Sequence, residues 1–308
     1  MKYLFGPVLS RRLGVSLGVD LMPLKFCNMD CIYCEIGKTS NLIKKRLEYV
    51  PTEDVINELE VYLNKSPKLD YITFSGCGEP TAHIGLNKII IFLKENFPQY
   101  KVCLITNSTF LDPNKECFLK LDLVMPSLDS ADEKVFNLIN RPSESVKLKQ
   151  IIYNLTLFRK KMKGQMWLEI FFVSGVNDTN EQLKKLYEVV KRINPHKIQL
   201  NSLDRPSTEG WVEKPSLQKM EQIKEAFLPF NAEIVAKYPK TDFQREFSTN
   251  IFDGILSNIK HRPLIKQELA NILNINIKDL QKYLKILLKK GKIEFRKRGE
   301  HEFIILKR

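Results

Sequence analysis

Three cysteines lie close together near the start of the chain, in the segment FCNMDCIYCEIG (26–37). Cys27, Cys31 and Cys34 are four and three positions apart, and they make up half of the six cysteines in the chain. Thiols this close together are typical of a metal site or a redox centre in a reducing compartment, and not of a disulfide framework. Thiolate-rich sites select zinc or iron–sulfur clusters.

The number of ligands helps to separate these metals. Structural zinc takes four ligands, usually as two closely spaced pairs. The other cysteines, Cys77, Cys103 and Cys117, stand alone, and the four histidines form no closely spaced pair. Three cysteines bind three irons of a [4Fe–4S] cluster and leave the fourth iron open to a small chelating molecule. The sequence therefore favours a catalytic cluster, with structural zinc or redox-active thiols as the alternatives.

Six β-rich segments alternate with helical patterns between about residue 15 and residue 230. We expect strands over 15–21, 71–76, 101–106, 123–128, 167–175 and 197–203, and helices over about 52–65, 86–96, 113–120, 144–163, 179–193 and 215–228. Repeated strand–helix units predict an α/β fold with parallel strands and right-handed crossovers. An open doubly wound sheet and a partial barrel both fit this pattern, and both place function at the carboxyl ends of the strands.

Those strand ends carry the unusual residues of the chain. The first strand leads into the cysteine loop, and the others lead into GCGEPT (76–81), TNST (106–109), SLDS (127–130), GVNDT (175–179) and LDRPS (203–207). Such polar segments are also ordinary strand–helix connections. Their common position on one rim is what a single shared site would require.

The motif C-x₃-C-x₂-C with Tyr33 before its last cysteine resembles the signature of the radical S-adenosylmethionine superfamily. GCGEP, SLDS and GVND resemble further motifs of the superfamily, especially of its molybdenum-cofactor pyranopterin synthase branch, and the likeness covers about residues 5–210. More loosely, FGPVLSRRLGVSLGVDLMP (5–23) resembles small proteins classed with the wyosine tRNA synthetases. The wyosine enzymes carry further cysteines near the N-terminus, whereas no cysteine precedes Cys27 here.

The resemblance implies a partial (β/α)6 TIM-like barrel and an enzyme that uses a [4Fe–4S] cluster held by Cys27, Cys31 and Cys34. One electron then cleaves S-adenosylmethionine into methionine and a 5′-deoxyadenosyl radical, which abstracts hydrogen from a substrate. A reductant such as flavodoxin or ferredoxin is implied. The residues expected to bind S-adenosylmethionine are Tyr33, Gly76, Gly78, Glu79, Pro80, Thr106, Asn107, Ser127, Asp129, Val176 and Asn177. Among them, Glu79 is expected to accept a hydrogen bond from the ammonium group.

Three arginines near the same rim are candidate substrate contacts. Arg11, Arg12 and Arg205 could contact an anionic group, but for each of them we favour an ordinary surface position. Glu169 is a candidate if it faces inward from its apolar strand. Cys77 is either a reactive thiol or, as we favour, a small buried residue that fills space.

The last 59 residues have a different composition. They hold 14 of the 49 Lys and Arg but only 6 of the 36 Asp and Glu, so they contribute +8 of the net charge of +13. The pattern predicts a barrel over 1–230, a linker over 231–249 and a winged-helix domain over 250–308, with helices near 250–259, 265–273 and 277–290 and strands at 292–295 and 302–306. The residues that could contact RNA, tRNA in particular, are Lys278, Lys282, Lys285, Lys289, Arg296, Lys297 and Arg298.

Two other readings of this arrangement stay open. The winged helix could instead dock a protein or peptide substrate of an activase. The cluster could also serve only as a sensor attached to a DNA-binding domain, although a sensor needs no GCGEP motif. The composition is that of a soluble protein without a membrane span, since the longest apolar run is IIIFL (89–93). An export signal at LSRRLG would place its cleavage site near the cysteine motif, so a cytoplasmic location is expected.

Overall fold

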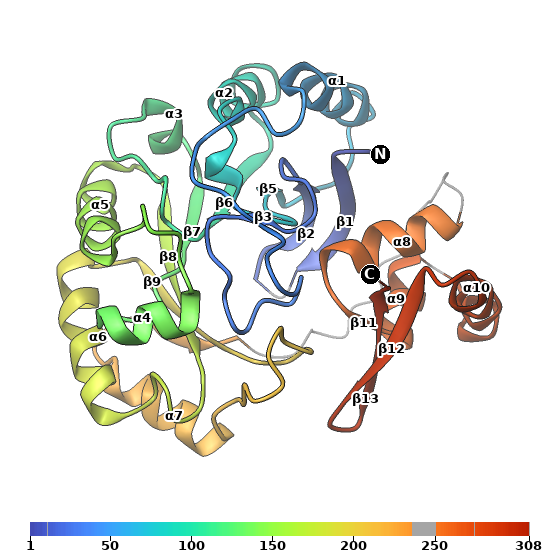
Figure 1. The fold of residues 1–308 in the computed structure, drawn as a ribbon. Coiled ribbons are helices and arrows are strands. Elements are labelled where there is room, and N and C mark those ends of the chain that lie inside the picture. Colours follow the sequence, from blue (N-terminus) through green and yellow to red (C-terminus); the bar gives the residue numbers. More distant parts are fainter. Residues whose placement is uncertain (11, 236–250, 274, 308) are drawn as a thin grey trace.

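Eight strands form one central sheet in the order β1–β2–β5–β6–β7–β8–β9–β10. The computed structural model describes residues 1–10, 12–235, 251–273 and 275–307 (Figure 1). Each neighbouring pair from β2 to β10 is parallel, and β1 is antiparallel to β2. The strands are β1 (Leu4–Ser10), β2 (Gly14–Val19), β5 (Tyr71–Phe74), β6 (Lys101–Thr106), β7 (Leu123–Pro126), β8 (Gln165–Phe172), β9 (Lys197–Ser202) and β10 (Ala232–Ile234).

The six strands expected from the sequence are present as β2 and β5 to β9, and the sequence analysis missed β1. Its centre is Gly6–Pro7, a pair that normally indicates a turn. Proline is tolerated here because β1 is an edge strand, and the register with β2 shifts between Phe5 and Val8. The irregular pairing absorbs the missing N–H of the proline.

The strand β10 is a second difference from the expected organisation. It lies inside 231–249, the range expected to be a linker, and it pairs in parallel with β9. Three residues are too few for a periodic pattern, so the sequence carried no signal for it. The first unit therefore extends past residue 230, and 236–250 of the expected linker lie outside the described residues.

Helices cover the outer face of the sheet (Figure 1). They are α1 (Thr52–Leu63), α2 (Leu86–Asn96), α3 (Glu116–Leu119), α4 (Glu133–Asn140), α5 (Leu148–Lys161), α6 (Asn180–Ile193) and α7 (Leu217–Ala226). Apolar side chains of the helices, such as Leu59 of α1, pack against outward-facing strand residues such as Val102 in one continuous core. Helix α4 was not expected, although Asp132 accepts hydrogen bonds from the backbone N–H of Lys134 and Val135 as an N-cap.

The inner face of the sheet holds a smaller apolar cluster of its own. Cys103, Leu123 and Met125 are fully buried there, next to the partly buried Trp167. In β6, Cys103 points inward while Val102 and Leu104 point outward, as strand alternation requires. This cluster fills part of the space inside the curved sheet.

The chain ends in a separate unit with its own core. It comprises α8 (Ile251–His261), β11 (Leu264–Ile265), α9 (Lys266–Leu273), α10 (Ile277–Lys289), β12 (Ile293–Arg298) and β13 (His301–Leu306). The strands form a sheet in the order β11–β13–β12, and the buried Ile255, Leu269 and Leu284 belong to one apolar cluster. The three helices and two of the strands lie where the sequence predicts them, and β11 is an addition. None of the helices described in the two units is long and apolar enough to cross a lipid bilayer.

Candidate active site

The cysteine loop follows β2, at the carboxyl end of the sheet. Cys27 ends the short strand β3 (Phe26–Cys27), which pairs in parallel with β4 (Asn41–Leu42). Beyond it the chain makes two turns, with Cys34 N donating to Cys31 O at 3.1 Å and Gly37 N donating to Cys34 O at 3.0 Å. All three thiols are free and half-buried. The loop therefore presents three cysteines together at the end where the strand motifs meet.

Two asparagine amides donate hydrogen bonds to these sulfurs. Asn140 Nδ2 lies 3.4 Å from Cys31 Sγ, and Asn107 Nδ2 lies 3.7 Å from Cys27 Sγ. Asn107 is also held by Asn28, whose Oδ1 accepts from the same Nδ2 at 2.8 Å. A thiolate is a far better acceptor than a thiol, so donors aimed at sulfur suit cysteines that are ionised by a bound cluster.

Burial works against ionisation of the cysteines when they hold no metal. It raises the pKa of Cys27 to about 12 and also raises the pKa of Cys31 and Cys34. Thiols in this setting stay protonated near neutral pH and are poor nucleophiles, and iron binding would release their protons. In the described ranges, no three His, Cys, Asp or Glu side chains are placed to hold one metal ion. A four-iron cluster needs no such convergence, because each cysteine binds a different iron.

The GCGEP loop packs directly against the cysteine loop. A Cβ atom on Gly78 would lie 1.8 Å from the carbonyl oxygen of Phe26, the residue before Cys27. Gly76 has a φ of +148° and leaves no room for a side chain beside Asp20. Lys25 N donates to Cys77 O at 3.0 Å between the two loops. The glycines thus let this loop and the cysteine loop approach each other, a contact that the sequence analysis did not foresee.

Glu79 is buried and saturated with hydrogen bonds. Only 2% of it is exposed, and its carboxylate accepts from Thr106 Oγ1 and Asn107 N, both at 2.6 Å, and from Thr81 N at 3.0 Å. Burial raises its pKa, and these hydrogen bonds oppose the rise. Glu79 therefore ties its own loop to the end of β6. The expected contact with the ammonium of S-adenosylmethionine stays a prediction.

Asp129 stands at the centre of a second polar group. Its carboxylate accepts from Tyr33 Oη at 2.6 Å, from Asn140 Nδ2 at 2.7 Å and from Phe171 N at 2.9 Å. Burial raises its pKa to about 6 despite these donors. Tyr33 is stacked on Phe171, with 3.8 Å between the ring centroids. The side chains of Tyr33 and Asp129 are therefore held in place by the protein next to Cys34.

The remaining residues expected to bind the cofactor differ in whether their side chains are already buried or hydrogen-bonded within the protein. Asn177 is fully buried, and its Nδ2 donates to Asp129 O and Phe171 O, both at 2.8 Å. Val176 packs in the same small apolar cluster as Tyr33, and Pro80 is buried at the start of a 3₁₀ turn. By contrast, the half-buried Ser127 has no hydroxyl partner among the described residues, so its hydroxyl can serve a ligand.

A cavity of about 240 Å³ lies inside the sheet, next to the GCGEP loop. Gly76 lines it from that loop, Ser16 and Thr73 from the strands, and Asn258 from α8 of the C-terminal unit. Arg12 and Arg205 line it too, and Arg12 forms an ion pair with Glu169. Because Arg12 lines the cavity, its ion pair shows that the Glu169 carboxylate faces the inner side of the sheet. Arg11 lies outside the described residues.

Arg205 is buried, so the surface position that we favoured for it is wrong. Its side chain is only 4% exposed and lies 3.5 Å from Glu35 and 3.3 Å from Glu268. Its Nε donates to Pro263 O at 2.8 Å. Because Glu35 follows Cys34 while Glu268 and Pro263 belong to the C-terminal unit, Arg205 joins that unit to the cysteine loop. The sequence analysis names Arg205 as a candidate residue, but no sequence pattern predicted its contacts with the C-terminal unit.

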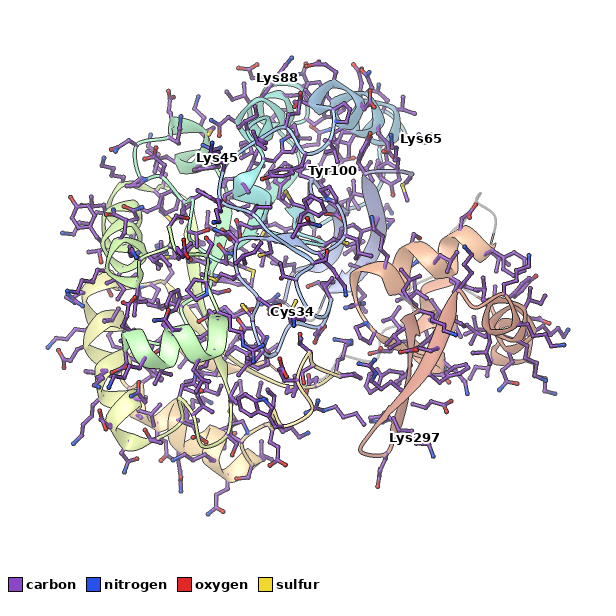
Figure 2. The ribbon with its side chains drawn as sticks, viewed as in Figure 1. Cys34, Lys45, Lys65, Lys88, Tyr100 and Lys297 are labelled. Carbon is purple, nitrogen blue, oxygen red and sulfur yellow. The ribbon has the colours of Figure 1, made fainter. Side chains whose placement is uncertain are left out.

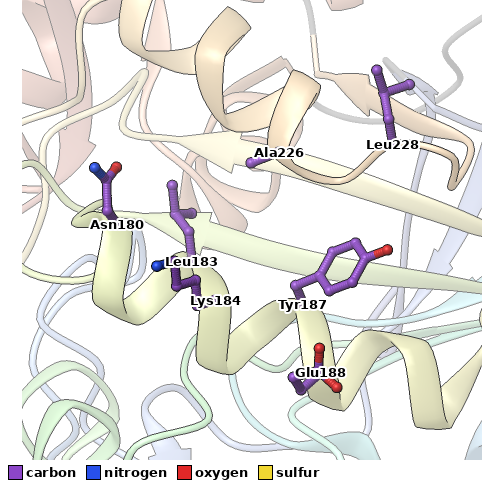
Figure 3. Close-up of a pocket in the computed structure, with 7 residues that line it drawn as sticks. All are labelled: Asn180, Leu183, Lys184, Tyr187, Glu188, Ala226 and Leu228. Carbon is purple, nitrogen blue, oxygen red and sulfur yellow. The ribbon is translucent and has the colours of Figure 1, made fainter.

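The three cysteines outside the loop are core residues, as expected. Cys77, Cys103 and Cys117 are 2%, 0% and 6% exposed, and burial raises the pKa of each thiol. A separate groove lies away from the candidate site. It runs between α6 and α7 on the outer layer and is lined by Asn180, Leu183, Lys184, Tyr187, Glu188, Ala226 and Leu228 (Figure 3). None of the candidate residues lines it.

Comparison with known families decides between the metals. The family model described as "Radical SAM superfamily" matches residues 21–190, which include the cysteine loop and the GCGEP loop. The chain belongs to the radical SAM superfamily. It is therefore an enzyme that uses a [4Fe–4S] cluster and S-adenosylmethionine, as the resemblance implied, and its mostly parallel sheet is consistent with the partial barrel of this superfamily.

Individual relatives of this radical SAM protein cover most of its length. A UPF0026 protein of Helicobacter pylori strain 26695 is 35% identical over 306 residues, which span 97% of this chain and 96% of that protein. A protein named GTPase Obg from Brachyspira hyodysenteriae is 32% identical over 95% of this chain, but the chain spans only 43% of its length. Among solved structures, a radical SAM methyltransferase from Sphaerobacter thermophilus has the same fold, with a TM-score of 0.56, 13% identity and coverage of 71% of this chain and 65% of that chain.

Several residues of the radical SAM site could not be found from the sequence. Asn140 reaches Cys31 only in the folded chain, Asn28 accepts from Asn107 Nδ2 at 2.8 Å, and Asp20 accepts from Cys77 N at 3.2 Å. Asn140 ends a helix that the sequence analysis missed, and Asp20 stands directly after β2. The one available signal was position, because Asp20 is a buried carboxylate at the carboxyl end of a strand.

Proposed function

We propose that this radical SAM enzyme holds its cluster on Cys27, Cys31 and Cys34 and abstracts a hydrogen atom from an RNA substrate, tRNA in particular. When bound, the cluster supplies the electron that cleaves S-adenosylmethionine into methionine and a 5′-deoxyadenosyl radical. The observation that carries the proposal is the packing of the GCGEP loop onto the cysteine loop, with the central cavity next to both.

The residues of the chain have distinct proposed tasks in this reaction. Gly76 and Gly78 keep the space beside the cysteine loop free of side chains, where the methionine part of S-adenosylmethionine would bind. The hydroxyl of Ser127, which has no partner in the part of the chain that the structure describes, is available to a ribose or carboxylate oxygen. Asp129 and Asn177 hold the ends of β7 and β8 in place around the adenine. The chain thereby orients the cofactor and excludes water from it.

An RNA substrate is supported by the charge of the C-terminal unit. We infer that this unit is a winged helix, with α10 as its third helix and the β12–β13 hairpin as its wing. Lys278, Lys285 and Lys289 of α10 are exposed and have no carboxylate in ion-pair range within the described parts of the chain. Lysines of this kind suit RNA phosphates.

Three other basic residues of this unit are already engaged. Lys282 lies 2.8 Å from Asp279, and Arg296 lies 3.1 Å from Glu294. Arg298 donates to Val212 O at 3.1 Å and so fastens the hairpin to the barrel unit. Lys297, at the exposed tip, remains for contact with RNA. Of the seven expected contacts, the proposal therefore rests on Lys278, Lys285, Lys289 and Lys297.

A cleft connects this unit with the cysteine loop. It measures about 340 Å³, and Lys25 and Lys38 line it from the barrel unit while Lys260 and Arg296 line it from the C-terminal unit. The cleft and the central cavity both contain Glu35, the residue after Cys34. The cavity is too small for a helix, so a single nucleotide turned out of its stack is what would reach the radical.

A protein or peptide substrate is the second candidate, and one observation favours it. Two of the arginines that line the cavity form ion pairs with glutamates, Arg12 with Glu169 and Arg205 with Glu35. Because these two charges are already paired, the cavity suits an uncharged side chain as well as a base. The alternative substrate is therefore a peptide whose side chain enters the same cavity.

Deuterium transfer distinguishes the two substrates. The reconstituted enzyme is given S-adenosylmethionine, a reductant and either total tRNA or total protein from cells grown in deuterated medium. We expect deuterium in 5′-deoxyadenosine with the tRNA, and affinity for tRNA that falls steeply with salt. Deuterium that arises only from the protein pool would contradict an RNA substrate.

A further inference from the structure

We propose that the segment 41–47, here named the basic ribbon, is the docking surface for the acidic redox protein that reduces the cluster. The proposal rests on the cluster being held at Cys27, Cys31 and Cys34. The ribbon begins with β4 and has the sequence NLIKKRL, with three basic residues and no acidic one. It contains none of the residues proposed to bind S-adenosylmethionine or RNA.

The ribbon touches the cysteine loop through its backbone. Leu42 is the pairing partner of Cys27 in the β3–β4 ladder, and Ile43 N donates to Cys27 O at 2.9 Å. Neighbouring strands lie only about 4.8 Å apart. A protein that contacts Leu42 is therefore one strand away from a cluster ligand, the short separation that electron transfer needs.

The charge of the ribbon is not neutralised by the protein. Lys44 and Lys45 are exposed, and neither has a carboxylate in ion-pair range within the described residues. Lys88, by contrast, is paired with Glu53. Arg46 donates to Thr81 O at 2.9 Å and anchors the ribbon beside the GCGEP loop. Two uncompensated lysines on a segment that pairs with the cysteine loop attract an acidic partner and speed its encounter.

Apolar exposure on the same segment favours a protein over RNA. Leu42 is 43% exposed and Leu47 is 54% exposed, so two aliphatic side chains flank the two lysines. Aliphatic residues ringed by charge are typical of protein interfaces, whereas unpaired RNA is recognised mainly by stacking on aromatic rings. Two aromatic residues close by, Phe26 and Tyr49, pack edge to face against each other, and the Tyr49 hydroxyl donates to Lys45 O at 2.7 Å. A small patch of this kind suits the brief encounters of redox proteins.

Flavodoxin serves as the probe, because it is acidic and carries one electron at a time. Its flavin hydroquinone loses one electron and becomes the semiquinone, and the oxidised cluster takes up that electron. The test variant is Lys44→Glu with Lys45→Glu. The control variant, Lys65→Glu with Lys68→Glu, changes the charge equally on exposed lysines; Figure 2 shows Lys65 at the outer edge of the molecule, far from Cys34 near its centre.

The rate of cluster reduction is measured anaerobically by rapid mixing with reduced flavodoxin, and separately with photoreduced deazaflavin, a small reductant that needs no docking surface. At low ionic strength we expect the test variant to be reduced by flavodoxin at least roughly tenfold more slowly than the control. The difference should vanish at high salt, because exposed charges are then screened. Iron content and reduction by deazaflavin should not change.

Three results would overturn the proposal. An unchanged flavodoxin rate would remove the docking role. Lost iron or slow reduction by deazaflavin would mean that the ribbon holds the cluster and not a partner. A loss of tRNA affinity with a normal flavodoxin rate would make the ribbon an RNA surface. Failure of the proposed function is separate, since wild-type enzyme would then form no 5′-deoxyadenosine with deazaflavin.

Discussion

Asn140 bridges a cluster ligand and the buried carboxylate of the site. Its Nδ2 donates to Cys31 Sγ at 3.4 Å and to Asp129 Oδ2 at 2.7 Å, while its Oδ1 is buried without a partner among the described residues. Asp129 in turn accepts from Tyr33, the neighbour of Cys34. The end of α4 and the segment after β7 are thereby tied to the cysteine loop.

The hydrogen bond to Cys31 should raise the reduction potential of the cluster. Asn140→Leu removes the donor, so extra negative charge on the reduced cluster is less well stabilised. A lost hydrogen bond worth about 1 kcal/mol corresponds to a potential lower by roughly 40 mV for one electron. The potential is measured by redox titration followed by electron paramagnetic resonance. Asn137→Leu, at an exposed position of the same helix, is the control, and equal potentials in both variants would refute the role.

The close approach of the two loops should make Gly78 intolerant of a side chain. Gly78→Ala places a Cβ atom against the carbonyl of Phe26, so the backbone before Cys27 has to move. We expect at least a severalfold loss of bound iron after reconstitution and weaker binding of S-adenosylmethionine. Gly210→Ala is the matched control, because a Cβ atom there meets nothing within 4 Å. Iron and sulfide contents alike in the two variants would contradict the packing.

The raised pKa of Asp129 predicts how stability depends on pH. In the unfolded chain this carboxyl loses its proton near pH 3.8, and in the folded chain near pH 6, so its favourable contribution is complete below about pH 4 and is lost as the pH rises through 6. In the apoprotein, the free energy of unfolding should therefore fall with rising pH, and Asp129→Asn should remove up to about 3 kcal/mol of that fall. Urea unfolding at pH 4.5, 6 and 7 measures it. Parallel stability curves for wild type and variant would exclude a raised pKa.

The tie made by Arg205 should hold the C-terminal unit in place. Arg205→Gln removes the buried cation from the partly exposed Glu35 and Glu268, and a hydrogen bond to a charged group is worth about 1.5–3 kcal/mol. We expect faster proteolysis between the two units and a lower urea midpoint. Arg192→Gln on the exposed side of α6 serves as control. If both variants resist protease equally, the units are held together by other contacts.

The sequence predicted those parts of the fold and site that repeat or cluster locally. The six parallel strands have periodic apolar patterns, and the cysteines with GCGEP lie within short segments. Contacts between distant segments were out of reach, since nothing near Asn140 or Arg205 in the chain indicates Cys31 or Glu268. The short strand β10 and the proline-containing β1 were missed because neither has the alternation of an ordinary strand.

The role of Glu79 shows why a motif alone does not assign a task. From the sequence it is an acidic residue in a turn, free to meet a ligand. In the structure its carboxylate already accepts from Thr106, Asn107 and Thr81 in a buried setting. The residue types and their order were sufficient to predict the chemistry of the site, whereas the partner of each side chain depended on the folded arrangement.

The most direct measurement is the cleavage of S-adenosylmethionine by the anaerobically reconstituted protein. With dithionite as reductant, wild-type protein should form 5′-deoxyadenosine and methionine in equal amounts, while Cys34→Ala should bind less iron and form neither. Cys103→Ala, a change at a buried cysteine outside the loop, should keep the activity. No 5′-deoxyadenosine from wild type, or the same amount from Cys34→Ala, would contradict a catalytic cluster on Cys27, Cys31 and Cys34.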